Sequence, residues 1–136
     1  MGERSRIAAR YGIERRTLQL AAVLAGFVPV IAGGAGALHG ARFIDGWPGR
    51  AADSHWRYLS GLLLAIGLAY WSCIPAIERR GTVVRTLTFL VVVGGLARLG
   101  GILAVGDPGN IRYALVMELG VAPLLCLWQA RIAKAA

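Results

Sequence analysis

Hydrophobic residues gather in four long runs along the chain, separated by shorter polar stretches. The runs cover residues 17–38, 56–76, 82–105 and 113–130. Each is close to the roughly 20 residues that an α-helix needs to cross about 30 Å of hydrocarbon. None alternates polar and apolar residues with a period of two, and a bilayer admits only helices or closed barrels. The pattern therefore predicts an all-α protein, a four-transmembrane-helix bundle that forms one membrane domain over residues 1–136.

The polar stretches between the runs predict one loop and two tight turns. Residues 40–54 are expected to form the longer loop. Residues 106–112 contain Asp, Pro, Asn and two glycines, which favour turns. Residues 77–81 end a helix with two arginines near its negative pole and a glycine behind them. Short turns of this kind predict that helices adjacent in sequence run antiparallel.

Composition favours a membrane protein over a soluble helical bundle. Hydrophobic residues make up 57% of the chain and charged residues 16%, whereas soluble domains average about 25% charged residues. A soluble four-helix bundle would need polar outward faces, and these runs are apolar nearly all round. Fifteen basic residues face seven acidic ones, but no basic stripe with interleaved aromatic residues indicates nucleic-acid binding. We expect no nucleic-acid partner.

The distribution of cations predicts that both termini are cytoplasmic. Four cations fall on one side of the predicted membrane, at positions 42, 50, 57 and 112. Ten fall on the other: Arg4, Arg6, Arg10, Arg15, Arg16, Arg79, Arg80, Arg85, Arg131 and Lys134. Such an excess in short loops marks the cytoplasmic side, so we expect a multi-pass protein of a bacterial inner membrane. Residues 1–16 are interpreted as a basic interfacial segment that forms a short helix, with a frayed basic tail as the alternative. Cleavage after residues 35–37 as a signal peptide is disfavoured by the length of the run.

Small residues on each run predict where the helices pack. In lipid, close helix approach depends on Gly, Ala and Ser. The glycines expected at helix contacts are Gly26, Gly33, Gly36, Gly40, Gly61, Gly94 and Gly101. The first run carries more small residues than one neighbour needs. We therefore predict that Gly33, Gly36 and Gly40 contact a helix outside the four-helix unit.

Charges inside the apolar runs are the candidate functional residues. Arg98 and Glu118 lie ten residues before and after Pro108, which places them at similar depth in an antiparallel pair, about 10 Å below the outer interface. With Arg57, Tyr58, Tyr113, His55 and His39 they are interpreted either as a buried ion pair that fixes helix register or as a ligand pocket open to the outside. A metal site at His39, Asp53 and His55 lacks the usual number of ligands. We expect no metal and no cofactor.

Several of these residues also lie in segments that resemble a known family. The segments are residues 55–61, 74–79, 94–98, 118–119 and 122–123. They are similar to an uncharacterised bacterial family of small four-helix integral membrane proteins, a domain of unknown function. The resemblance covers the chain from about Gly26 to Trp128 and omits the basic N-terminal segment. It implies the four-helix fold and places Arg on the second and third helices and Glu on the fourth, but it implies no activity.

The sequence shows no catalytic spacing, so an enzyme is not expected. The length favours a structural or accessory subunit of a membrane assembly. The alternative is a small transporter or ligand-binding membrane protein that uses the pocket around Arg57, Arg98 and Glu118. The expected partners are membrane lipid and either other membrane protein subunits or further copies of this chain.

Overall fold

The computed structural model describes residues 2–43, 49–106, 109 and 112–135, and within these ranges the chain is helical, without strands. Helix α1 spans Glu3–His39, α2 Arg50–Cys73 and α3 Gly81–Val105. The last helical stretch consists of α4 (Arg112–Leu115), the π-helical turn η3 (Val116–Val121) and α5 (Ala122–Ala135). Two short 3₁₀ helices, η1 (Gly40–Phe43) and η2 (Ile74–Ala76), follow α1 and α2.

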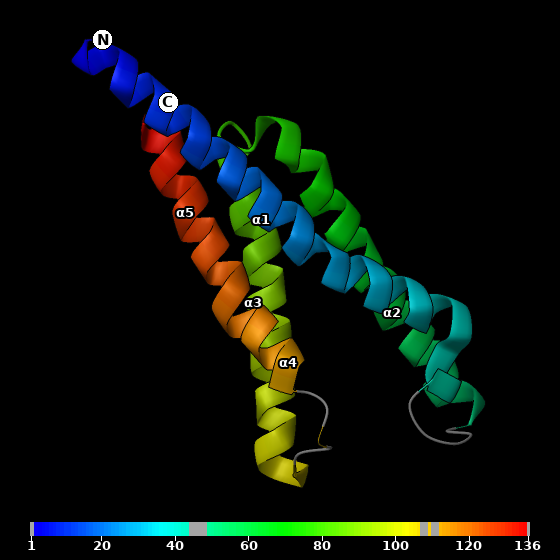
Figure 1. Cartoon of the computed structure of the whole chain (residues 1–136). Coiled ribbons are helices and arrows are strands. Elements are labelled where there is room, and N and C mark those ends of the chain that lie inside the picture. The colour runs from blue at the N-terminus through cyan, green and yellow to red at the C-terminus, as the bar shows by residue number, and fades with distance from the viewer. Residues whose placement is uncertain (1, 44–48, 107–108, 110–111, 136) are drawn as a thin grey trace. The chain divides into compact units, whose positions relative to one another are not determined.

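The chain divides into two compact units (Figure 1). The hairpin unit, residues 26–72, contains the second part of α1, η1 and nearly all of α2. The core unit, residues 1–25 and 73–136, contains the first part of α1 and everything after α2. Helix α1 therefore passes through both units.

In the hairpin unit, α1 and α2 run antiparallel and meet through small residues. A Cβ added at Gly33 would lie 2.5 Å from the backbone nitrogen of Leu64 and 2.8 Å from the carbonyl oxygen of Ser60. Gly26 faces the Trp71 indole, and Gly36 faces the side chain of Ser60. Only glycine allows so close an approach, because any side chain at these positions would meet the facing helix.

The glycines of α1 thus face the neighbouring helix of the same chain. The expectation that Gly33, Gly36 and Gly40 contact a helix outside the chain is wrong, since α2 occupies that surface. The face that α2 presents also differs from the expected one. Gly67 packs on α1 close to Val30, whereas a Cβ at Gly61 would meet nothing within 4 Å.

In the core unit, α3 packs against α4, η3 and α5. The largest fully buried side chains are Leu18, Ile77, Val84, Gln129 and Ile132. They come from the first part of α1, the α2–α3 connection, the start of α3 and the end of α5. The core therefore lies where these four segments meet, at the end of the unit that carries both termini.

Two helices begin earlier than the hydrophobic pattern predicts. Helix α1 starts at Glu3 rather than at residue 17, so residues 3–16 continue the first apolar run as one helix of 37 residues. This segment is rich in Arg, Ala and Glu, which have high helix propensity. Helix α2 starts at Arg50 rather than at residue 56, with Asp53 at the positive end of its dipole. The predicted loop over 40–54 is therefore wrong for residues 50–54.

Candidate functional site

Arg98 on α3 and Glu118 in the π-helical turn η3 form an ion pair in the core unit. Arg98 donates hydrogen bonds from Nε to Glu118 Oε2 and from Nη2 to Oε1, both at 3.0 Å. Two parallel bonds of this kind fix both the distance and the orientation of the two groups. The structure thus brings these two predicted candidate residues into direct contact.

Glu118 lies in a local departure from the α-helix that was not predicted from the sequence. The last helical stretch widens into a π-helical turn over Val116–Val121, and the amide of Ala122 donates to the carbonyl of Met117, five residues earlier. Pro123 follows directly. Proline lacks an amide hydrogen and its ring crowds the carbonyl four residues before it, so the wider turn relieves the clash. Turns of this kind often occur at functional sites. Pro123 was the sequence feature from which this turn could have been predicted.

The contact between α3 and η3 is made by a glycine next to the predicted one. A Cβ at Gly95 would lie 2.8 Å from both Glu118 Cβ and Leu119 Cδ2. At Gly94 and Gly101 a Cβ would meet nothing within 4 Å. The Arg98 side chain, between these faces, keeps 35% of its surface exposed, against 16% for Glu118. The pair is therefore half-buried against η3, and its arginine side opens onto the unoccupied face of α3.

Arg57 in the hairpin unit is part of a different cluster, at the junction of α1 and α2. Its Nη1 donates to the carbonyls of Ala37 and Leu38, and its Nε donates to Asp53 Oδ2 at 2.8 Å. Asp53 Oδ1 in turn accepts the amide hydrogen of Ala41 at 2.9 Å. The two side chains thus satisfy backbone groups that the end of α1 leaves without helical partners.

The backbone at this junction requires a glycine. Gly40 has φ +65° and follows the last residue of α1, the position at which left-handed glycines commonly end helices. A Cβ there would collide with the side chains of Asp53 and Arg57. Arg57 therefore holds the end of α1 against α2 through its hydrogen bonds to the carbonyls of Ala37 and Leu38.

The other predicted site residues are exposed on their helices. His55 and Tyr58 lie on α2 in the hairpin unit, where Tyr58 is 64% exposed. Tyr113 lies on α4 in the core unit and is 85% exposed. Within the described residues, no group of three or more His, Cys, Asp or Glu side chains has the arrangement of a metal site.

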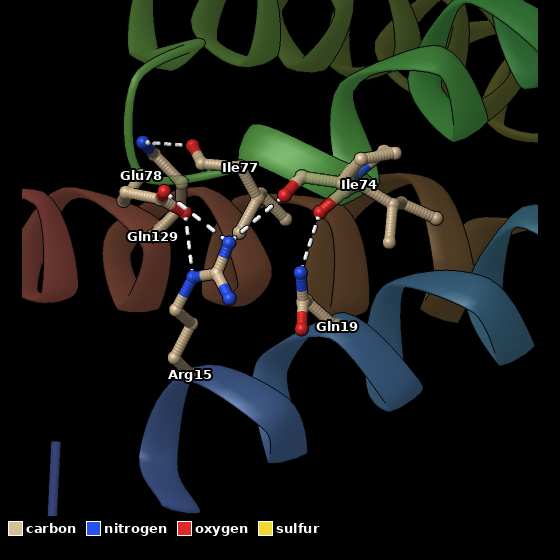
Figure 2. Close-up of polar contacts among 7 residues, drawn as sticks. Arg15, Gln19, Ile74, Ile77, Glu78 and Gln129 are labelled. Atoms are coloured by element: carbon tan, nitrogen blue, oxygen red, sulfur yellow. Dashed lines mark hydrogen bonds and ion pairs between the residues drawn. The ribbon is translucent and has the colours of Figure 1, made fainter. Parts of the chain in front are cut away.

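A second polar cluster of the core unit, not predicted from the sequence, surrounds the α2–α3 connection (Figure 2). Arg15 of α1 donates to Glu78 Oε2 at 2.9 Å and to the carbonyl of Pro75 at 2.8 Å. Gln19, one turn further along α1, donates to the carbonyl of Ile74. Arg131 of α5 pairs with Glu14 at 3.2 Å. These bonds tie the first part of α1 to the connection and to the end of α5.

Gln129 of α5 completes this cluster from the buried side. Its side chain is fully buried and donates to the carbonyl of Ile77 at 2.8 Å (Figure 2). Its Oε1 accepts no hydrogen bond from the residues that the structure describes, and it lies near Gly81, the first residue of α3. Glutamine is rarely buried, so its place in the core indicates that the backbone bond to Ile77 fixes the connection.

The electrostatics of the connection follow from the Arg15–Glu78 contact. The hydrogen bond from Arg15 holds the pKa of the Glu78 carboxyl below its ordinary value of 4.5, and the positive charges of Arg15 and Arg79 act in the same direction. Partial burial opposes this shift. Glu78 is therefore ionised at neutral pH and available to hold Arg15.

Comparison with known proteins identifies a family but no activity. The sequence profile of the domain of unknown function DUF4345 matches residues 17–129. The chain belongs to this family. No curated protein and no solved structure matches the chain. The matched region includes Arg57, Arg98 and Glu118 and begins within α1, after its basic N-terminal turns.

Proposed function

We propose that this chain is an integral membrane protein that crosses the bilayer four times as a helical bundle, with both termini in the cytoplasm of a bacterial cell. Four helical stretches in the described residues are long and apolar enough to span: Ser5–His39, Arg50–Ala76, Gly81–Val105 and Arg112–Ala135. Ten of the fifteen basic residues fall on the side that this topology makes cytoplasmic, as the positive-inside rule requires.

We further propose that the protein serves as a structural or accessory subunit of a membrane assembly. The observation that carries this proposal is the surface of α3. Only 6% of its most apolar stretch is buried inside the chain, and the space beside Gly94 and Gly101 is open. With about 100° of rotation per residue, these two glycines share one face, about 100° round the helix from the Gly95 face that packs on η3. Open glycines of this kind suit close approach of another transmembrane helix.

Leucine substitutions on α3 test this role. Gly94→Leu should fill the open face and weaken co-purification of partner subunits, or of further copies of the chain, in mild detergent. Gly100→Leu is the matched control, because Gly100 also borders open space but lies on a third side of the same helix. Equal retention of partners in both variants and in the unaltered protein would show that this face of α3 meets lipid, and would count against the accessory role.

A second candidate is a small transporter or ligand-binding protein that uses the Arg98–Glu118 pair. It is favoured by the position of an ionisable pair within two candidate spans and at a π-helical turn, since ionisable residues at membrane depth often mark substrate paths. Against it, Arg98 and Glu118 neutralise each other. Variants of the pair in which stability and activity are measured separately decide between the candidates.

A further inference from the structure

One end of the core unit carries nearly all the net charge of the protein. The first part of α1, the α2–α3 connection with the start of α3, and the end of α5 together contain ten basic and three acidic residues, a surplus of seven in a chain whose net charge is +8. The described bonds hold the first part of α1 against this connection and against α5. The surplus is therefore concentrated at one end of the core unit.

The acidic residues nearest the connection are already paired. Glu78 is held by Arg15 and Glu14 by Arg131. Arg16, Arg79, Arg80 and Arg85 are exposed, and within the described residues none of the four forms an ion pair. Their charge is therefore left for a partner outside the chain.

These four arginines lie in two segments that the Arg15–Glu78 contact holds together. Arg16 follows Arg15, whose guanidinium reaches Glu78, and Arg79 and Arg80 follow Glu78 directly. Arg85, one turn into α3, folds back toward the start of the helix, where its Nη2 donates to Thr82 Oγ1 at 3.3 Å. An arginine just inside a span folds back in this way to reach the headgroup region.

The start of α3 adds a further attraction for anions. Within the described residues no side-chain cap hydrogen bond is made at the N-cap residue Arg80, so the first amide hydrogens of this 25-residue helix lack helical partners at its positive end. Arg79, Arg80 and Arg85 flank this turn. Backbone donors and guanidinium groups together match the oxygens of a phosphate group.

We propose that Arg16, Arg79, Arg80 and Arg85 form a binding site for the phosphate groups of anionic phospholipids in the cytoplasmic leaflet. The proposal rests on the membrane placement proposed above. That placement sets the start of α3 at the hydrocarbon boundary, and headgroup phosphates are the anions found at this depth. Juxtamembrane clusters of four to eight Lys or Arg bind anionic lipid, each contributing about 1 kcal/mol, or about fivefold in affinity.

Lipid binding to the purified full chain in neutral detergent tests the site directly. Phosphatidylglycerol and phosphatidylcholine are compared by native mass spectrometry. The chain should bind phosphatidylglycerol in preference to phosphatidylcholine, and Arg79→Gln and Arg80→Gln should each weaken that binding about fivefold. Arg50→Gln is the matched control, because Arg50 is an exposed arginine at the start of a helix, α2, outside the charged end. It should leave the preference unchanged.

Two measurements on the unaltered chain test the site without depending on whether a variant folds. In about 1 M salt, where charges are screened beyond about 3 Å, the preference for phosphatidylglycerol should disappear. Inorganic phosphate at moderate concentration should not displace the lipid. Displacement by phosphate, or by a DNA oligonucleotide that binds more tightly than the lipid, would overturn the proposal in favour of a soluble anion or a nucleic acid.

The outcome separates this inference from the proposed function. Equal binding of the two lipids, or an Arg50→Gln effect as large as that of Arg80→Gln, refutes the phosphate site while leaving membrane insertion and the accessory role untouched. A chain that stays soluble without detergent contradicts the membrane placement itself, and with it both proposals.

Discussion

Substitution of the Arg98–Glu118 pair separates a structural role of this contact from a functional one. Arg98→Leu leaves the Glu118 carboxylate without its partner, and Glu118→Leu leaves the guanidinium without its two acceptors. The double substitution removes both charges and replaces them with apolar side chains. A structural pair predicts that each single variant is less stable and that the double variant regains most of the loss, since apolar replacements of a buried pair are often close to neutral.

The geometry sets the size of the effect. Breaking a buried pair costs about 3–5 kcal/mol, and this pair has two charge-assisted bonds of 3.0 Å but an Arg98 side chain that is 35% exposed. In a bilayer that exposed surface meets lipid or protein rather than bulk water, although an arginine can draw water and headgroups toward itself. We therefore expect about 2–3 kcal/mol for each single variant. The interaction term should exceed the average of about 0.6 kcal/mol for polar contacts between membrane helices.

Reversible unfolding in detergent micelles measures the free energy of unfolding of the unaltered chain, the two single variants and the double variant, which together form a double-mutant cycle. Strictly additive losses, with no recovery in the double variant, would refute the reasoning, because independent sites show no interaction term. If stability recovers and partner retention persists, the pair is structural. If stability recovers while a cellular phenotype is lost, the pair belongs to a working site and the transporter or ligand-binding candidate moves ahead.

Three further variants test other contacts by their free energy of unfolding. Gly33→Ala should cost about 1–3 kcal/mol, because its Cβ would press on the backbone of α2; Gly61→Ala, which borders open space, should be neutral or stabilise by up to about 1 kcal/mol. Arg57→Gln should cost about 1–2 kcal/mol by releasing carbonyls at the end of α1 and the Asp53 carboxylate. The lowered pKa of Glu78 predicts a contribution to the free energy of unfolding that is complete above about pH 5 and is lost as the pH falls through the folded-state pKa. Glu78→Gln should remove this contribution from the dependence of the free energy of unfolding on pH.

The hydrophobic pattern alone was sufficient to place the helical stretches. Span length and apolar composition are local properties, and they located α3 almost to the residue, at 82–105 against Gly81–Val105. A short helix over residues 1–16 was one of two interpretations, but its continuity with the first apolar run was not predicted, because arginine lowers hydropathy while it favours a helix. A search for apolar residues therefore finds where a helix could enter the membrane, not where the helix begins.

Contacts between helices were harder to predict, because the choice of face depends on the partner. Their similar depth in an antiparallel pair predicted that Arg98 and Glu118 meet. It did not predict that Gly95, rather than Gly94, packs on the π-helical turn. On α2 a stripe through Gly61 was expected, yet Ser60, Leu64 and Gly67 meet α1. Faces one residue apart differ by about 100°, and small residues occur on more than one of them.

Backbone hydrogen-bond acceptors explain the clusters that sequence reasoning did not find. Arg57 was assigned to a pocket, but its partners include the carbonyls of Ala37 and Leu38. Gln129 likewise binds the carbonyl of Ile77. Every residue has such a carbonyl, so the identity of the residue gives no sign of which one will accept.

Topology reporters test the central claim most directly, because the membrane placement underlies both the accessory role and the lipid site. Fusions at Ala136 and at Gly81 should report a cytoplasmic location, and a fusion at Gly49, just before α2, should report an external one. This is the result expected from four spans with ten cations inside and four outside. A cytoplasmic signal at Gly49 would contradict the account.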